Sequence, residues 1–126
     1  RNPINHMTVM FKKSTVLEAG NYQHAPLYED YDLWVRMLMK GYKFANSNDV
    51  LVYVRAGDNM YRRRGGMLYA KQEIFMQIKF YKLGFLSIFR LIKNVMIRVP
   101  VRLMPSELRC VIYARLLRDS SKRTPL

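Results

Sequence analysis

Asp30 is the residue whose setting most strongly suggests chemistry, because it is an acid placed among large apolar side chains. It belongs to the segment YEDYDLWVRMLMKGYKF, which predicts a helix over about residues 29–40 that Gly41 closes. At about 100° per residue, Leu33 and Trp34 fall on either side of Asp30, whereas the other charges gather on a different face. Those charges are Glu29, Asp32, Arg36 and Lys40, with Asp32 and Arg36 as a favourable i,i+4 pair.

Two interpretations of Asp30 are compatible. As an acid in the first turn, it accepts backbone N–H bonds and is favoured by the helix dipole. As a site, a carboxylate held at a helix N-terminus beside Trp34 can accept a proton from a bound hydroxyl group. A capping role fixes the rotamer that a general base needs, so both interpretations stay open. Trp34 is interpreted mainly as a core residue, and otherwise as part of the wall of a binding pocket.

A basic loop supplies the second group of residues that can bind a ligand. The segment MYRRRGGM places three arginines directly before Gly65 and Gly66. Guanidinium groups suit phosphate oxygens, and glycines let a backbone approach closely. One interpretation is therefore a phosphate-binding loop, and the other is a solvated basic loop. The candidate ligands are Arg55, Asn59, Arg62, Arg63 and Arg64.

Residues that ligate metals are few and scattered along the chain. His6 and His24 are interpreted as structural or solvent-facing, with His6 a weak candidate for a metal ligand. The single cysteine, Cys110, can form no intrachain disulfide and suggests a reducing compartment. We interpret Cys110 as a small buried apolar residue. Apart from His6, the sequence predicts no metal site in this chain.

The composition is that of a folded, basic domain. The chain has 126 residues, of which 50% are hydrophobic and 13% aromatic, so it can bury a core. Its formal net charge is +13, and residues 79–126 contribute +9 of it (11 basic residues minus 2 acidic ones). An anionic partner is therefore expected mainly at that end. The sequence shows neither a run of about 20 apolar residues nor the pattern of a signal peptide at its start.

Three short apolar runs predict strands, and periodic segments predict helices. The expected strands are His6–Phe11, Lys43–Ala45 and Val50–Arg55. Besides the helix of Asp30, the expected helices cover about residues 16–20, 67–83, 85–98 and 105–118, with Pro100 as an interruption. The predicted fold class is α+β, with a few short strands in residues 1–66 and a mainly α-helical region in residues 67–126.

The helices toward the C-terminus are predicted to be basic and amphipathic. Arg90, Lys93 and Arg98 share one side of a helix, and the opposite side carries Phe85, Leu86, Phe89, Ile92 and Met96. A later segment, LRCVIYARLLR, combines arginines with aliphatic residues in the same way. Such helices fit the surface of an anionic membrane. The alternatives are helices packed on the preceding domain with a solvated basic face, and a nucleic-acid-binding module that the net charge alone favours.

The segment YEDYDLWVRMLMKGYKF, followed by VLVYVR, resembles the C-terminal half of the family 2 glycosyltransferases of bacterial surface-polysaccharide synthesis. The likeness extends over about residues 2–66. It implies that Glu29 and Asp30 form the ED pair of that family, with Asp30 as the catalytic base and Glu29 binding acceptor hydroxyls or shaping the loop. In two places the chain departs from the family pattern. AGNY stands in place of the usual GGY-like turn, and Gly57 stands where many members have a histidine.

The resemblance implies an inverting transfer of a sugar from a nucleotide-sugar to a hydroxyl of a polysaccharide or lipid-linked acceptor, in capsule or lipopolysaccharide synthesis. The arginine-rich loop would then contact the donor diphosphate or a lipid diphosphate. A divalent metal, Mg²⁺ or Mn²⁺, is expected in the complete enzyme. No Asp-x-Asp motif precedes the ED segment in this chain. We therefore expect residues 1–66 to be the acceptor-side half of a Rossmann-like (A-type) glycosyltransferase domain, without the nucleotide-binding half and inactive on its own.

The same resemblance implies which partners the protein has and where in the cell it acts. The partners are a nucleotide-sugar, a saccharide or lipid-linked acceptor, and an anionic membrane surface, whereas nucleic acid is disfavoured. Strands left without neighbours would have exposed edges, which favours a homo-oligomer. The expected location is the cytoplasm, at the periphery of the inner membrane.

Overall fold

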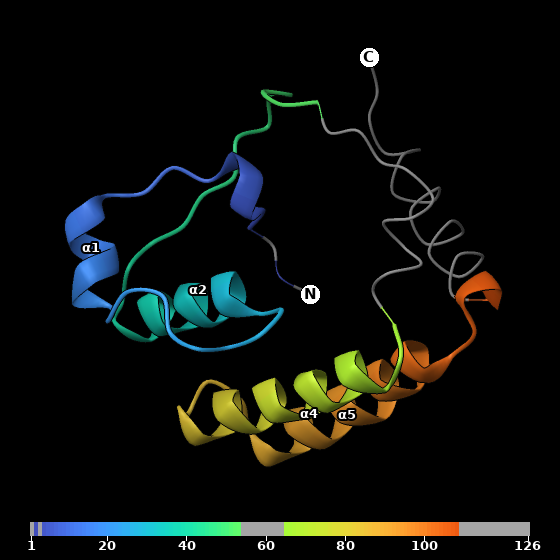
Figure 1. The fold of residues 1–126 in the computed structure, drawn as a ribbon. Coiled ribbons are helices and arrows are strands. Elements are labelled where there is room, and N and C mark those ends of the chain that lie inside the picture. Colours follow the sequence, from blue (N-terminus) through green and yellow to red (C-terminus); the bar gives the residue numbers. More distant parts are fainter. Residues whose placement is uncertain (1, 3, 54–64, 109–126) are drawn as a thin grey trace.

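The computed structural model describes residues 2, 4–53 and 65–108, and within them all regular structure is helical. The elements are η1 (His6–Thr8), α1 (Lys13–Glu18), α2 (Glu29–Met39), α4 (Met67–Lys82) and α5 (Ile88–Leu103). Residues 106–108 form a further helical turn. Figure 1 shows α4 and α5 side by side, with α2 lying over them and α1 beyond α2. The α4–α5 hairpin therefore forms one layer, and α1 and α2 form the other.

The predicted strands are absent from the described residues, so the α+β, Rossmann-like assignment is wrong there. Residues 6–8 form a 3₁₀ turn, in which the Asn5 side chain accepts a hydrogen bond of 3.3 Å from the Met7 N–H. Residues 43–45 and 50–53 carry no regular structure. The backbone at Asn5 and Val9 is extended, as in a strand. An extended segment becomes a strand only when a neighbour pairs with its backbone, and β-prone residues alone do not provide one.

The helix of Asp30 is confirmed, and it begins and ends close to the predicted residues. Three acids lie in the first turn of α2, where the helix dipole favours negative charge. Gly41 adopts a φ of 85°, a left-handed conformation that costs glycine little. The turn is closed by hydrogen bonds from the Gly41 N–H to Leu38 O, at 2.9 Å, and from the Tyr42 N–H to Met37 O, at 3.2 Å.

The α4–α5 hairpin follows the predicted pattern except at Pro100. Gly84 reverses the chain with a φ of 77°, and Ser87 caps α5 by accepting a hydrogen bond of 3.4 Å from the Arg90 N–H. Pro100 was expected to interrupt the helix, but it lies inside α5, which continues to Leu103. Because Pro100 stands near the end of the helix, its missing N–H removes a hydrogen bond from only the last turns. None of the helices in the described ranges has the length and apolar character that a membrane span needs.

Helix α2 separates two small hydrophobic cores. One core joins it to α1 and contains Val16, Ala19, Leu33, Trp34 and Met37. The other joins it to α4 and contains Ala25, Val35, Met76 and Phe80. Across the second core, the rings of Tyr31 and Phe80 meet edge to face with their centres 4.9 Å apart. Because α2 packs on both sides, the position of its N-terminus is set by the two layers together.

Candidate functional site

Asp30 lies at the N-terminus of α2, half-buried, with polar neighbours on both carboxylate oxygens. Oδ1 accepts a hydrogen bond of 2.7 Å from the Tyr31 N–H, and Oδ2 accepts one of 3.2 Å from the side-chain amide of Asn2. A carboxylate oxygen can accept more than one hydrogen bond, so these two contacts orient the group and leave capacity for a ligand hydroxyl. The preceding acid, Glu29, is exposed.

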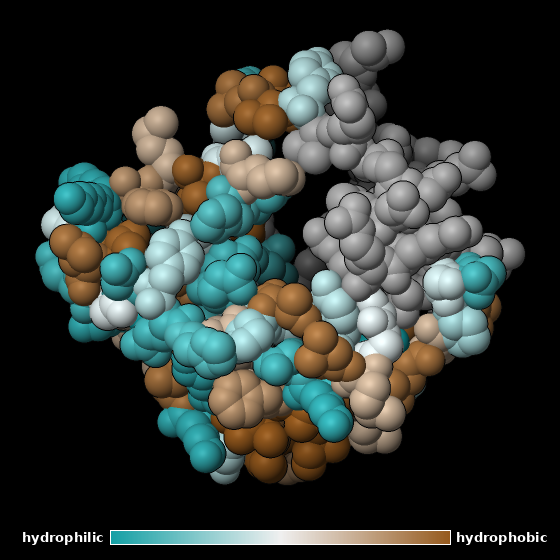
Figure 2. Space-filling model, in the orientation of Figure 1, coloured by the Kyte–Doolittle hydropathy of each residue, from teal (hydrophilic) through white to brown (hydrophobic). Residues whose placement is uncertain are grey.

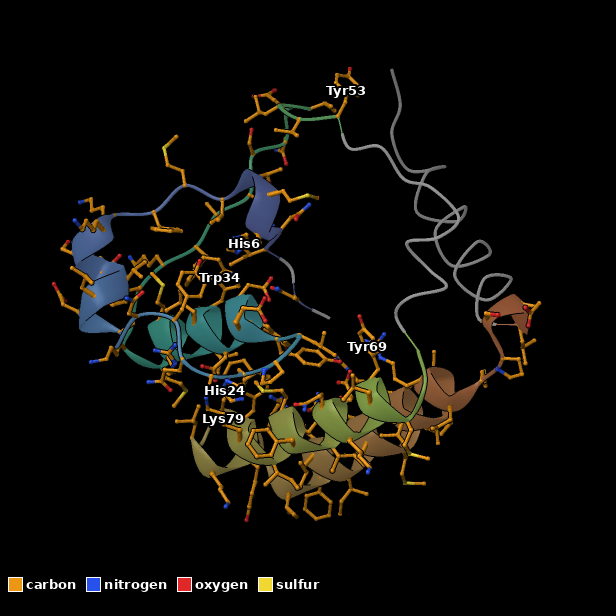
Figure 3. All side chains as sticks on the ribbon, in the orientation of Figure 1. His6, His24, Trp34, Tyr53, Tyr69 and Lys79 are labelled. Carbon is orange, nitrogen blue, oxygen red and sulfur yellow. The ribbon has the colours of Figure 1, made fainter. Side chains whose placement is uncertain are left out.

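One further side chain that could take part in chemistry, Tyr22, lies near this carboxylate, and His6 contacts Tyr22. Burial first, and then the negative charges of Asp30 and Glu29, raise the pKa of the Tyr22 hydroxyl. The Tyr22 ring meets the His6 ring edge to face, with 5.9 Å between centres. Figure 3 shows His6 on the side of α2 that faces away from α4 and α5. The structure thus links Asp30, Glu29 and His6 through Tyr22, which the sequence had not singled out.

The other predicted site residues are not part of this group. Trp34 is buried in the first core, between Phe11 and Phe44, whose ring centres lie 5.8 and 6.0 Å from its own. Trp34 is thus a core residue of this structure, and its predicted part in a binding pocket stays a prediction. His24 is exposed. Arg55, Asn59, Arg62, Arg63 and Arg64 lie outside the described residues, as do Cys110 and most of the helix predicted over residues 105–118.

No metal centre is formed within the described ranges. They contain no group of three or more His, Cys, Asp or Glu side chains placed to hold an ion. His6 has an aromatic neighbour in Tyr22. The divalent metal that the resemblance implies for the complete enzyme therefore stays a prediction, to which the described residues add no ligand group.

A cleft of about 1040 Å³ opens on the α1 side of the molecule, between the segment around η1 and the segment that follows α2. Its walls are largely apolar and include Ile4, Val9, Phe11, Tyr42, Phe44 and Val52. These walls include residues from all three segments that the sequence predicted to be strands. Asp30 and Glu29 are not among the lining residues. The candidate base therefore lies outside this cleft.

Two residues of the charged face of α2, Asp32 and Arg36, are buried, whereas Glu29 and Lys40 are exposed, and no pattern in the sequence indicated this difference. Arg36 Nε lies 3.0 Å from Asp32 Oδ2, which confirms the predicted pair, and Lys79 Nζ of α4 lies 2.6 Å from Asp32 Oδ1. The Arg36 guanidinium also donates to the carbonyl oxygens of Ala19 and Asn21, which anchors the loop before α2. Asp32 is fully buried, and these two cations compensate its charge.

A second buried carboxylate, Glu73 of α4, contacts the residue that precedes the candidate site. Its Oε2 accepts a hydrogen bond of 2.6 Å from the hydroxyl of Tyr28, the residue directly before α2. Arg98 and Arg102 of α5 lie 3.1 and 3.4 Å from the same carboxylate. Burial by itself would raise the pKa of Glu73, but the hydrogen bonds from Tyr28 and Gln77 and the two arginines outweigh burial and lower it. The Tyr28 pKa is raised, by burial first and then by Glu73.

Relatives of this chain are glycosyltransferases. It is 40% identical over 118 residues to the UDP-Gal:alpha-D-GlcNAc-diphosphoundecaprenol beta-1,3-galactosyltransferase of Escherichia coli, a match that covers 94% of this chain and 43% of that protein. It is 39% identical to the amylovoran biosynthesis glycosyltransferase AmsE of Erwinia amylovora, over 91% of this chain and 43% of the relative. An uncharacterized glycosyltransferase of Haemophilus influenzae is 38% identical, over 94% of this chain and 43% of the relative.

The chain thus spans 43% of the length of these curated relatives. No family model matches it, and no solved structure matches it. The class to which its relatives belong agrees with the resemblance found in the ED segment. The similarity covers nearly the whole chain, so it includes the α4–α5 hairpin as well as that segment.

Proposed function

We propose that this chain is the acceptor-side part of an inverting, family 2-like glycosyltransferase, with Asp30 as the catalytic base. The observation that carries the proposal is the setting of Asp30. It is a half-buried carboxylate at a helix N-terminus, oriented by Asn2 and the Tyr31 N–H, within a segment that resembles the ED motif. The glycosyltransferase relatives support the reaction class.

The proposed chemistry is a single displacement at the anomeric carbon of the donor sugar. Asp30 accepts the proton of the acceptor hydroxyl while that oxygen forms a bond to the anomeric carbon. The bond from this carbon to the diphosphate breaks, and the nucleoside diphosphate leaves with the electron pair. Attack from the side opposite the leaving group inverts the anomeric configuration. In this proposal Glu29 binds acceptor hydroxyls, which its exposure beside Asp30 supports.

We extend the proposal to the class of substrate. The name of the Escherichia coli relative specifies a UDP-sugar donor and an acceptor linked to a polyprenol diphosphate. We propose the same two classes here, in the synthesis of a bacterial surface polysaccharide. An acceptor with a polyprenol chain is held in a membrane, which supports a peripheral location at the cytoplasmic side of the inner membrane. The proposed homo-oligomer stays a prediction, and the described residues supply no strand edge for it.

The test replaces the matched part of the Escherichia coli galactosyltransferase with this chain and measures UDP release and product formation. Asp30→Asn should lower kcat by about 100-fold or more, because general base catalysis contributes about 10² to 10⁴. Glu29→Gln should act mainly on the KM for the acceptor. The matched control is Asp49→Asn, an exposed aspartate, which should leave both constants unchanged. Full activity of the Asp30→Asn chimera would exclude Asp30 as the base.

A further inference from the structure

Helix α5 presents its apolar side to solvent and its polar side to the protein. Asn94, Arg98 and Arg102 face α4, where they contact Gln77 and Glu73. The opposite side carries large apolar residues, including Phe89 and Met96, which are 82% and 70% exposed. The sequence placed Arg98 on a basic face with Arg90 and Lys93, but the structure directs Arg98 inward to Glu73. This orientation is the reverse of the one that an amphipathic helix takes when its apolar face fills a core.

Helix α4 adds a parallel stripe to the same exposed surface. Leu68, Phe75 and Ile78 are exposed at helical spacing, with Lys71 and Lys82 between and beyond them. The residues of α4 that face α2 are buried, so the stripe lies on the side of the hairpin turned away from α2. In Figure 2 hydrophobic surface gathers along the lower edge of the molecule, where α4 and α5 lie in Figure 1. We call the exposed side of Leu68–Lys82 and Ile88–Leu103 the outer face of the hairpin.

The charge of the outer face has one sign. Residues 67–103 contain seven basic residues and one acid, so their net charge is +6. The acid is Glu73, which is buried and held by Arg98 and Arg102. The exposed charges at the apolar stripes are therefore cationic, among them Lys71, Lys82, Arg90 and Lys93. Large apolar side chains flanked by cations, with no exposed acid among them, fit the interface of an acidic bilayer.

We propose that the outer face of the α4–α5 hairpin binds the surface of an anionic lipid bilayer, with Phe89, Ile92 and Met96 inserted among the acyl chains and the lysines at the headgroups. The proposal deepens the proposed function and rests on it, because it supplies the surface that brings the enzyme to a membrane-held acceptor. The inward side of the same hairpin holds Tyr28 through Glu73. A nucleic acid fits less well, because its phosphates would engage the cations and leave the apolar stripes in water.

The test is co-sedimentation of the full chain with vesicles of phosphatidylcholine alone and of phosphatidylcholine mixed with phosphatidylglycerol. We expect binding to the acidic vesicles that weakens with salt, and little binding to the neutral ones. Met96→Ser combined with Phe89→Ser should lower the partition coefficient by about tenfold or more, because both side chains lose their apolar contact with the bilayer. Both residues are exposed, so circular dichroism should show an unchanged fold.

Two matched controls test whether vesicle binding depends on the outer face itself or only on the overall hydrophobicity and charge of the chain. Met10 is the control for hydrophobicity, because it is 97% exposed but lies on a different surface, near η1. Met10→Ser should leave the partition coefficient within about twofold. Met96→Ser alone should lower it. Lys93→Glu should weaken binding to acidic vesicles more than Lys13→Glu, although both change the net charge equally. Equal effects within either pair would overturn the proposal.

Other occupants of the face give different results. If a second copy covers it, sedimentation velocity will show a dimer that Met96→Ser dissociates, and vesicle binding will not depend on Met96. If nucleic acid is the partner, duplex binding will be stronger than vesicle binding and will depend on Lys93 but not on Phe89. Either result overturns the proposal. Asp30→Asn should bind vesicles normally, so loss of the catalytic assignment and loss of the membrane assignment can be told apart.

Discussion

The hydroxyl of Tyr28 donates a hydrogen bond of 2.6 Å to the buried carboxylate of Glu73, which lies 45 residues further along the chain. Tyr28 directly precedes α2, and Glu73 belongs to α4. The contact therefore ties the N-terminus of α2, where Asp30 lies, to the α4–α5 hairpin. Arg98 and Arg102 hold the carboxylate from the other side, so the position of the candidate base depends on contacts from both layers.

Tyr28→Phe should lower the free energy of unfolding by about 2 kcal/mol, because it removes a hydrogen bond to a charged group and leaves the ring in place. Urea denaturation measures the change. Tyr53→Phe is the matched control, since Tyr53 is 93% exposed and should unfold at the same urea concentration as the unchanged chain. If both variants unfolded alike, the Tyr28–Glu73 bond would have no measurable role in stability.

The free energy of unfolding should fall in acid because of Glu73. Its pKa in the folded chain is lowered from the ordinary 4.5, so its ionised form stabilises the fold above the pKa of the unfolded chain. This contribution is lost as the pH falls below 4.5 toward the folded pKa. Denaturation between about pH 7 and pH 3 should therefore show a steeper acid decline for the unchanged chain than for Glu73→Gln. Parallel curves would contradict the assignment.

Asp30 and Asp32, two residues apart on α2, should lose very different amounts of folding free energy on the same substitution. Asp32→Asn removes the partner of Arg36 and Lys79 inside the protein and should cost about 3 to 5 kcal/mol of folding free energy. Asp30→Asn weakens the interaction with the helix dipole and the hydrogen bond from Asn2 at a half-buried site, and should cost about 1 kcal/mol. Thermal unfolding of the two variants compares them directly. A larger cost at Asp30 would show that its role is structural.

Trp34 should behave as a core residue with one unmet polar group. Its Nε1 is buried and has no hydrogen-bond partner among the described residues. Trp34→Ala should cost about 3 to 5 kcal/mol, because it leaves a cavity between Phe11 and Phe44. Trp34→Phe keeps an aromatic ring and removes the unpaired N–H, so it should cost markedly less. Equal losses in chemical denaturation would indicate that the indole nitrogen has a partner that stabilises the fold.

Local features of the fold were predictable from the sequence, because their causes lie within a few residues. The acids of the first turn and Gly41 set the two ends of α2, and Gly84 sets the turn between α4 and α5. The ED segment carried the resemblance to glycosyltransferases, and the relatives of the chain are glycosyltransferases. Asp32 and Arg36 were correctly paired for the same reason, since they lie one helical turn apart.

Tertiary structure alone decided which of these features are buried and which stay exposed. Burial of Asp32 depends on Lys79, and the network around Tyr28 depends on Glu73, both from a helix distant in the sequence. The outward apolar side of α5 follows from Arg98 turning to Glu73, and helical periodicity does not say which side of a helix meets the protein. Strand formation likewise depends on a pairing partner rather than on the β-prone residues themselves, and for this reason the predicted strands failed.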